Sequence, residues 1–357
     1  MRTSTTFLIL VLALLATGCT RQSDVVAIKL GHGLDVSHPV HKAMVRMNEL
    51  LIEKSDSTMR IDVYSSGQLG SERETLELLQ IGSLGLTKVS SSALESFVPE
   101  FRVFGLPFLF RDEAHRFAVL DGLVGRAILD TGQQFGLRGL TYYDAGTRSF
   151  YTKDRPVHTP DDLRGLKIRV QESPVAVQMV SALGGSPTPI SWGELYTSLQ
   201  QGIVDAAENN PPSFYLSRHY EVCRYFILDE HTAVPDVVIV STTLWNDLTP
   251  QQRQWLQEAA DESALYQREL WAESVRESLA AVEAAGVEII RPDKERFSSR
   301  VDALYDSFRN DPVVYDLIRR IQDVGRDSSS VPVGTQVEEH PTAGADRSSA
   351  GPKERGV

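Results

Sequence analysis

Residues 162–174 read D-L-R-G-L-K-I-R-V-Q-E-S-P and predict the central unit of the fold. Apolar side chains alternate with charged ones at Leu166, Ile168 and Val170 against Lys167 and Arg169. This is the period-two pattern of a strand that packs one face on a core. Ser173 and Pro174 then supply a favoured N-cap and a favoured first helical residue. The stretch therefore predicts a strand, a turn and a helix, with Arg169 at the carboxyl end of the strand.

Arg169 is the first candidate for ligand binding. In open α/β sheets, ligands bind in the crevice at the carboxyl ends of the strands. The start of the following helix would offer free N–H groups that favour anions. A guanidinium adds a planar group that binds a carboxylate through two parallel hydrogen bonds. A surface arginine on a half-buried strand would show the same local pattern, so this pattern alone leaves both interpretations open.

Two further segments accompany this unit: A-G-T-R-S-F-Y-T at residues 145–152, and W-G-E-L-Y-T-S-L-Q-Q-G-I-V-D-A-A-E-N-N at residues 192–210. Together the three segments resemble the signature of the substrate-binding proteins of tripartite ATP-independent periplasmic (TRAP) transporters, the DctP-like family. The resemblance extends from about residue 28 to about residue 322. It implies that Arg169 binds the ligand's carboxylate, that Arg148 is a second basic contact, and that Asn209 supplies an amide.

Composition limits the class of protein. The chain has 357 residues, 41% of them hydrophobic, which is enough to bury one large core or two modest ones. Its net charge of -12 argues against nucleic acid as a partner, because proteins that bind nucleic acid carry basic patches. Such a charge suits a soluble protein in an extracytoplasmic space.

The N-terminus predicts secretion to the periplasm. Arg2 precedes a short apolar run and small residues, so we expect a signal peptide over residues 1–18 rather than a membrane span. Gly18-Cys19 resembles a bacterial lipobox, which would make Cys19 a lipidated N-terminus followed by a tether over residues 19–26. Ala16 stands where leucine is more usual, so plain cleavage stays open. The other cysteine, Cys223, lies among apolar residues and is expected to be a buried thiol.

Strand and helix patterns alternate along the chain, which predicts an α/β fold with mostly parallel sheets. Strands are expected near residues 27–31, 59–65, 85–90, 140–143, 166–170, 203–206 and 236–241, and helices over 39–54, 174–183 and about 250–285. The family resemblance implies a two-lobed fold like that of periplasmic binding proteins, with a cleft between the lobes and the long helix spanning both. Lobe I would comprise residues 27–146 and 235–272, and lobe II residues 147–234 and 273–322. Residues 323–357 are polar and are expected to form a disordered tail.

Further ligand contacts are expected from side chains at strand ends and helix starts: His32, Glu72, Lys88, Ser90 and Ser173. Glu72 lies in the first turn of a helix whose capping box is Ser71 and Glu74, so its charge also has a structural explanation. Trp192 could stack on a sugar ring or pack against the protein.

The expected function is that of a receptor which binds one small organic acid and delivers it to the membrane subunits of a TRAP permease. The combined motifs are most similar to the branch that binds hexuronates such as D-glucuronate and D-galacturonate. Sialic acids, aldonates and C4-dicarboxylates remain alternatives, as does a receptor that serves a sensor. A secreted hydrolase is a remote alternative, because the sequence shows no zinc motif, nucleophile elbow or nucleotide-binding loop. No catalytic residue, cofactor or metal is expected, and the protein is expected to be a monomer.

Overall fold

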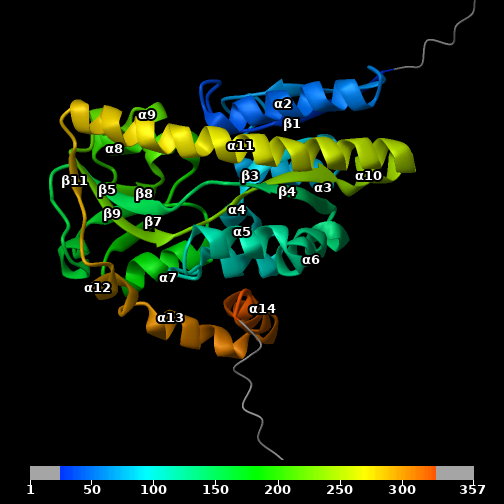
Figure 1. Cartoon of the computed structure of the whole chain (residues 1–357). Helices are drawn as coiled ribbons and strands as arrows, with labels where there is room; N and C mark the ends of the chain where they lie inside the picture. Colours follow the sequence, from blue (N-terminus) through cyan, green and yellow to red (C-terminus); the bar gives the residue numbers. More distant parts are fainter. Residues whose placement is uncertain (1–24, 327–357) are drawn as a thin grey trace, which may run out of the picture. The chain divides into compact units, whose positions relative to one another are not determined.

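Two β-sheets carry the fold of residues 25–326, the part of the chain that the computed structural model describes (Figure 1). The first sheet has the strand order β2-β1-β3-β10-β4. Its strands are β1 (Val26–Gly31), β2 (Met59–Tyr64), β3 (Leu86–Ser90), β4 (Leu137–Tyr143) and β10 (Asp236–Ser241). The second sheet has the order β11-β9-β5-β8-β6-β7. Its strands are β5 (Arg148–Thr152), β6 (Lys167–Val170), β7 (Ser186–Pro189), β8 (Ala206–Asn209), β9 (Tyr225–Thr232) and β11 (Glu288–Ile290).

Both sheets are mixed rather than mostly parallel, and the reason is the path of the chain between them. After β4 the chain crosses to the second sheet as β5, which pairs antiparallel with β8 and β9. After β9 it returns as β10, which pairs antiparallel with β3 and β4. The remaining pairs, such as β1 with β2 and β6 with β8, are parallel. The crossings therefore join the two sheets through continuous backbone.

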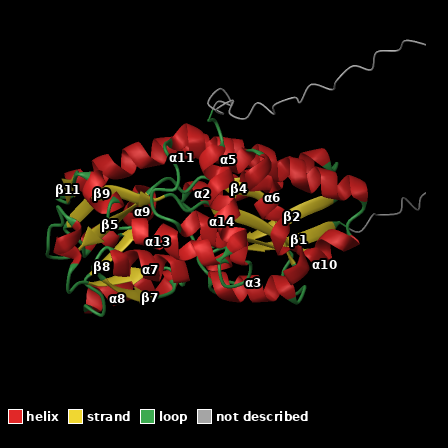
Figure 2. Ribbon diagram, turned by 90° about the horizontal axis from the view of Figure 1, so that it is seen from below, coloured by secondary structure: helices red, strands yellow, loops and turns green. Residues whose placement is uncertain are grey.

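Helices pack around both sheets (Figure 2). Those in the first half of the chain are α2 (Pro39–Lys54), α3 (Glu72–Gln80), α4 (Ser91–Leu94), η1 (Pro99–Gly105), α5 (Glu113–Asp121), α6 (Leu123–Thr131) and η2 (Gly132–Phe135). Those that follow are η3 (Pro160–Leu163), α7 (Pro174–Ala182), η4 (Trp192–Glu194), α8 (Leu195–Gln201), α9 (Pro211–Leu216), η5 (His219–Glu221), α10 (Thr242–Asp247), α11 (Pro250–Ala284), α12 (Lys294–Ser298), α13 (Asp302–Ser307), η6 (Phe308–Asn310) and α14 (Pro312–Asp323).

The long helix α11 contacts elements of both sheets, as expected. It begins with a capping box between Thr249 and Gln252 and continues for 35 residues. It packs on α2 and β4 beside the first sheet and on α9 beside the second (Figure 1). The expected α/β class and the spanning helix are thereby confirmed.

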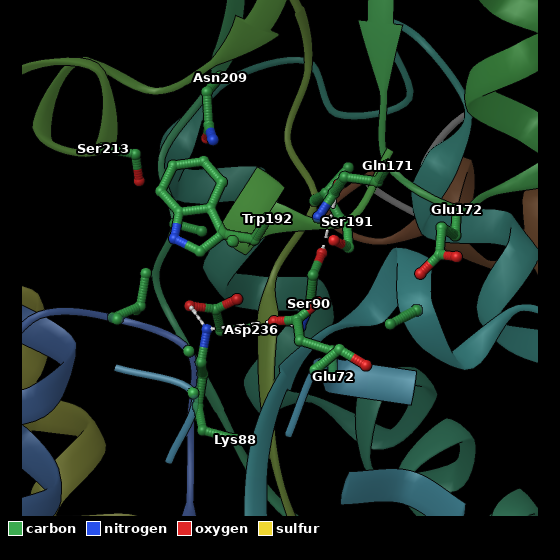
Figure 3. Close-up of a pocket in the computed structure, with 18 of the residues that line it drawn as sticks. Glu72, Lys88, Ser90, Gln171, Glu172, Ser191, Trp192, Asn209, Ser213 and Asp236 are labelled. Carbon is green, nitrogen blue, oxygen red and sulfur yellow. Dashed lines mark hydrogen bonds and ion pairs between the residues drawn. The ribbon is translucent and has the colours of Figure 1, made fainter. Parts of the chain in front are cut away.

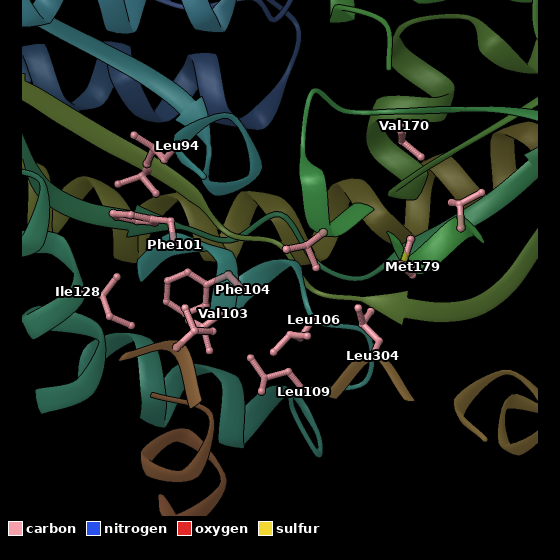
Figure 4. Close-up of a cluster of buried hydrophobic side chains, with 14 of the residues drawn as sticks. Leu94, Phe101, Val103, Phe104, Leu106, Leu109, Ile128, Val170, Met179 and Leu304 are labelled. Carbon is pink, nitrogen blue, oxygen red and sulfur yellow. The ribbon is translucent and has the colours of Figure 1, made fainter. Parts of the chain in front are cut away.

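One apolar cluster contains side chains from both sheet regions (Figure 4). Phe104 and Leu106 contribute from η1 and the segment after it, and Val175 and Met179 contribute from α7. The last helix, α14, packs on η1 and α6, which belong to the first sheet's surroundings. The cluster therefore ties the two sheets together away from the strand edges. The lobe boundaries given above stay a prediction.

Several local expectations can be compared with the structure. The Ser71–Glu74 capping box forms, and Cys223 is fully buried. Ser191 precedes η4, and its hydroxyl donates to the Glu194 carboxylate. The predicted signal peptide, Cys19 and residues 327–357 of the predicted tail lie outside the described residues. Within residues 25–326, no helix combines the length and apolar composition that crossing a bilayer requires.

Replacing Phe104 with alanine should destabilise the protein strongly. Phe104 is fully buried in the shared apolar cluster, so Phe104→Ala would leave a cavity there. We expect a loss of about 3–5 kcal/mol in the free energy of unfolding, measured by urea denaturation. The matched control is Phe135→Ala, since Phe135 is 39% exposed and should change the value by less than about 1 kcal/mol. Equal losses for the two variants would contradict the placement of the cluster.

Candidate functional site

A cavity of about 380 Å³ lies between the two sheets, and residues from both line it (Figure 3). Seven of the nine residues expected to bind ligand are part of this lining: Glu72, Lys88, Ser90, Arg148, Arg169, Trp192 and Asn209. The first-sheet wall is formed by residues from α3, β3 and β10. The second-sheet wall is formed by residues at the ends of β5, β6 and β8 and in η4. The cavity is therefore at the strand ends where ligands bind in α/β sheets.

Arg148 is buried and already paired. Its Nε and Nη2 donate to the carboxylate of Glu208, with Nη2 also donating to the Glu208 carbonyl at 2.8 Å. Its Nη1 donates to Oδ1 of Asn209 at 2.9 Å. Burial would lower the pKa of Arg148, but the carboxylate of Glu208 outweighs it and raises the pKa. Arg148 therefore has one Nη1 hydrogen left for a ligand, and its charge is balanced.

A buried ionic network stands behind Arg148. Nδ1 of His231 is 2.8 Å from Oδ2 of Asp229, and its Nε2 is 3.7 Å from Oε2 of Glu208. Burial would lower the pKa of His231, but Asp229 and then Glu208 raise it to about 9. Burial would raise the pKa of Glu208, but Arg148 and then His231 lower it to about 2. The network thus alternates two cations with two carboxylates, which is the arrangement that buried charges require.

Arg169 differs from Arg148 because no carboxylate of residues 25–326 forms an ion pair with it. Its side chain is 2% exposed and its Nε donates to the carbonyl of Ile190 at 2.8 Å. Its Nη1 is buried and has no hydrogen-bond partner among the described residues. The ring of Trp192 lies over the guanidinium, with its centroid 5.9 Å from Cζ. Burial lowers the pKa of Arg169 below its ordinary value. A buried guanidinium without a counter-ion is a site for an anion.

On the first-sheet wall, Lys88 lies between two carboxylates (Figure 3). Its Nζ is 3.0 Å from Oδ2 of Asp236 and 3.6 Å from Oε1 of Glu72. Oε1 of Glu72 also accepts a hydrogen bond from the backbone N–H of Ser90. Burial would lower the pKa of Lys88, but Asp236 and then Glu72 raise it. Lys88 is therefore charged, and its ammonium is paired with two carboxylates of the protein.

His32 and Ser173 do not line the cavity. Nε2 of His32 is 3.0 Å from Nδ1 of His41, and its Nδ1 accepts a hydrogen bond from the backbone N–H of Leu34. Ser173 caps α7 by accepting from the N–H of Ala176, and it donates to the carboxylate of Glu95. Both side chains therefore form hydrogen bonds within the protein instead of facing the cavity.

The start of α7 offers no free anion site either, contrary to the expectation from its sequence. The carboxylate of Glu95 accepts from the backbone N–H of Val175 and from the Ser173 hydroxyl. Because Glu95 follows α4 beside the first sheet, these bonds also connect the two sheet regions. The anion-binding role therefore falls on Arg169 and not on the helix terminus.

The two walls approach each other closely at two places. Oγ of Ser90 is 3.5 Å from Oε1 of Gln171, which follows Arg169 on the second-sheet wall. A Cβ added to Gly33 would lie 3.6 Å from Cδ1 of Trp192. Trp192 also packs on the ring of His219, at a centroid separation of 5.3 Å. Trp192 is therefore a lining residue that reaches across to the opposite wall.

Several lining residues were not expected from the sequence: His38, Gln171, Glu172, Ser191, Asn210, Ser213, Asp236 and Trp271. Gln171 and Asn210 follow strands that carry expected contacts, so the same strand-end argument could have included them. Asp236 begins a buried strand, and a charged residue at the start of an apolar strand could have been predicted to line the site. Trp271 is in the middle of α11, and no local pattern separates it from a packing residue.

Comparisons with known proteins give the class and then the family. Residues 30–311 match the family of bacterial extracellular solute-binding proteins, family 7 (DctP). A "Solute-binding protein" of Chromohalobacter salexigens is 36% identical over 289 residues, which cover 80% of this chain and 86% of that protein. The chain is thus an extracytoplasmic solute-binding protein rather than an enzyme. It belongs to the DctP family, whose members are TRAP periplasmic receptors.

Solved structures are similar over nearly the same span. A TRAP periplasmic solute-binding protein from Bradyrhizobium sp. BTAi1, in complex with α/β-D-galacturonate, is 40% identical with a TM-score of 0.82. The similarity covers 83% of this chain and 99% of that one. Another from Pseudomonas putida F1, with bound D-glucuronate, is 35% identical with a TM-score of 0.81, covering 85% of this chain and 98% of that one. The two-sheet architecture with its cleft is therefore that of the TRAP receptors.

The stabilising effect of His231 should depend on pH. Because its pKa is raised to about 9 in the folded protein, the folded state holds the proton more tightly than the unfolded state does. The stability that His231 contributes should be complete below about pH 6.5, the ordinary histidine value, and should fade as the pH rises through about 9. The measurement is the difference in unfolding free energy between the native protein and His231→Gln across this range. His158→Gln, at an exposed position, is the control. A difference that grows with rising pH would contradict the buried ion pairs.

Proposed function

We propose that this protein captures a hexuronate, such as D-galacturonate or D-glucuronate, and delivers it to the membrane subunits of a TRAP permease. The observation that carries the proposal is that Arg169 has no carboxylate partner in the described part of the chain. The other two cations of the cavity, Arg148 and Lys88, already have carboxylate partners in Glu208 and Asp236. One bound carboxylate would therefore balance the buried charge of Arg169.

The orientation of the neighbouring groups supports a carboxylate at this position. Oδ1 of Asn209 accepts from Nη1 of Arg148 and from the backbone N–H of Asn210. This leaves the Nδ2 group of Asn209 to donate to a ligand oxygen. Arg169 binds the carboxylate through parallel N–H groups, and Arg148 supports it with its remaining Nη1 hydrogen. The ion-pair network of Glu208, His231 and Asp229 holds Arg148 in place.

The remaining lining suits a hydroxylated ring. Serine, glutamine and asparagine side chains and the carboxylates of the first-sheet wall offer donors and acceptors, and Trp192 offers an apolar face. The solved relatives that contain D-galacturonate and D-glucuronate support this ligand class. Closure of two lobes around the ligand would then exclude water from it, as in other hinged binding proteins.

Replacing Arg169 with alanine should abolish most of the affinity. We expect a loss on the order of 3 kcal/mol or more, roughly a hundredfold in Kd, because the ligand carboxylate would be buried without a partner. Isothermal titration calorimetry with D-galacturonate and D-glucuronate measures this loss. The control is Lys167→Ala, an exposed position on the same strand. Unchanged affinity in Arg169→Ala would show that another group binds the carboxylate.

Lipid anchoring through Cys19 is a separate part of the proposal. The Gly18-Cys19 sequence supports it, although both residues lie outside the described part of the chain. Cells that express the full chain and are fed a labelled fatty acid should incorporate label into the protein, and Cys19→Ser should lose it. Equal absence of label in both would favour plain cleavage and a freely diffusing receptor.

A further inference from the structure

The charges of the cavity are distributed unevenly between its walls. On the second-sheet wall, Arg169 has no carboxylate partner among the residues that the structure describes, and it lies next to the balanced pair of Arg148 and Glu208. On the first-sheet wall, one cation, Lys88, faces two carboxylates, Asp236 and Glu72. With one ammonium and two carboxylates, the Lys88–Glu72–Asp236 cluster therefore carries a net formal charge of one negative unit. A monocarboxylate ligand is accordingly oriented with its acid toward Arg169.

The negative cluster also limits what the other end of the ligand can be. Asp236 and Lys88 are nearly fully buried, at 7% and 3% exposure, so water screens their charges little. A second carboxylate placed here would meet like charges, which disfavour its binding. A hydroxyl group, in contrast, can donate to either carboxylate and accept from the Lys88 ammonium. The cluster therefore discriminates by charge between an alcohol and an acid.

A second observation points to a ligand at this wall. His38, the N-cap residue of α2, also lines the cavity and is 3% exposed. Its Nδ1 accepts a hydrogen bond from the backbone N–H of Val40, so its Nε2 carries the proton in the neutral ring. Nε2 has no partner among the described residues. Burial and then Lys88 lower the pKa of His38 to about 3, so the ring adds a donor without adding charge.

Resting on the proposed sugar-acid function, we propose that Asp236, Glu72 and Lys88, with His38, form a specificity subsite. It accepts the hydroxylated end of the ligand and excludes a second carboxylate. The protein would thereby select sugar acids with one carboxylate over aldarates and C4-dicarboxylates, which the Arg169 site alone would not distinguish. The selection depends on two carboxylates facing one ammonium.

Two open-chain acids test this directly. D-Galactonate and galactarate differ only at carbon 6, which is an alcohol in the first and a carboxylate in the second. The native protein should bind galactonate at least tenfold more tightly than galactarate. Asp236→Asn removes one negative charge with little change in shape. It should reduce the ratio of the two affinities about tenfold, equivalent to about 1.4 kcal/mol. Glu72→Gln should reduce it in the same direction and serves as a second variant if Asp236→Asn does not fold.

The control is Glu77→Gln on the same helix as Glu72, because Glu77 pairs with Arg73 on the surface and does not line the cavity. The ratio of its affinities for galactonate and galactarate should equal that of the native protein. An unchanged ratio in both subsite variants, or a native protein that binds no galactonate, would overturn the subsite. D-Galacturonate titrated in parallel separates the two proposals. Suppose that D-galacturonate binds to the native protein but not to Arg169→Ala, while Asp236→Asn and Glu72→Gln leave the galactonate-to-galactarate affinity ratio unchanged. The subsite proposal is then wrong, and the proposed function stands.

Discussion

The candidate site depends on one buried guanidinium, that of Arg169, which has no carboxylate partner within residues 25–326. Desolvation disfavours a charged group, so a protein ordinarily pairs it, as this chain does for Arg148 with Glu208 and for His231 with Asp229. Arg169 is equally buried, yet the only described hydrogen bond from its side chain goes to the carbonyl of Ile190. The protein thus retains an electrostatic deficit that the carboxylate of the proposed ligand would remove. The free energy recovered on binding would make the cavity selective for anions.

The fold supplies the rigidity that this deficit requires. Arg148, Arg169 and Asn209 belong to neighbouring strands of one sheet, since β8 pairs with both β5 and β6. Their side chains therefore keep a fixed spacing. The opposite wall belongs to the other sheet, and the two are joined by the strand crossings, by α11 and by the shared apolar cluster around Phe104. In the proposed closure, the walls would approach each other while each wall keeps its own geometry.

Much of this arrangement could be predicted from the sequence. Alternation around Arg169 predicted its strand, and the strand-end rule together with the family resemblance predicted that Arg148, Arg169 and Asn209 lie close together. Strand direction could not be predicted in the same way, because β5 and β10 run antiparallel only as a consequence of crossing between sheets. The pairing of Lys88 with Asp236 joins residues far apart in the chain, so no local pattern indicates it. His32 and Ser173 were expected to contact the ligand from their positions in the sequence, but they do not line the cavity. Both are at the expected element ends, but their side chains already have hydrogen-bond partners within the protein, His41 and Glu95.

The central claim is that the ligand's carboxylate occupies the position beside Arg169 and that its hydroxyl groups face the Lys88–Glu72–Asp236 cluster. A crystal structure of the protein with D-galacturonate tests this most directly. The account predicts both carboxylate oxygens within hydrogen-bond distance of the Arg169 guanidinium, and at least one ring hydroxyl within the same distance of Asp236 or Glu72. A carboxylate bound to Lys88, with Arg169 facing the hydroxyl groups, would contradict it.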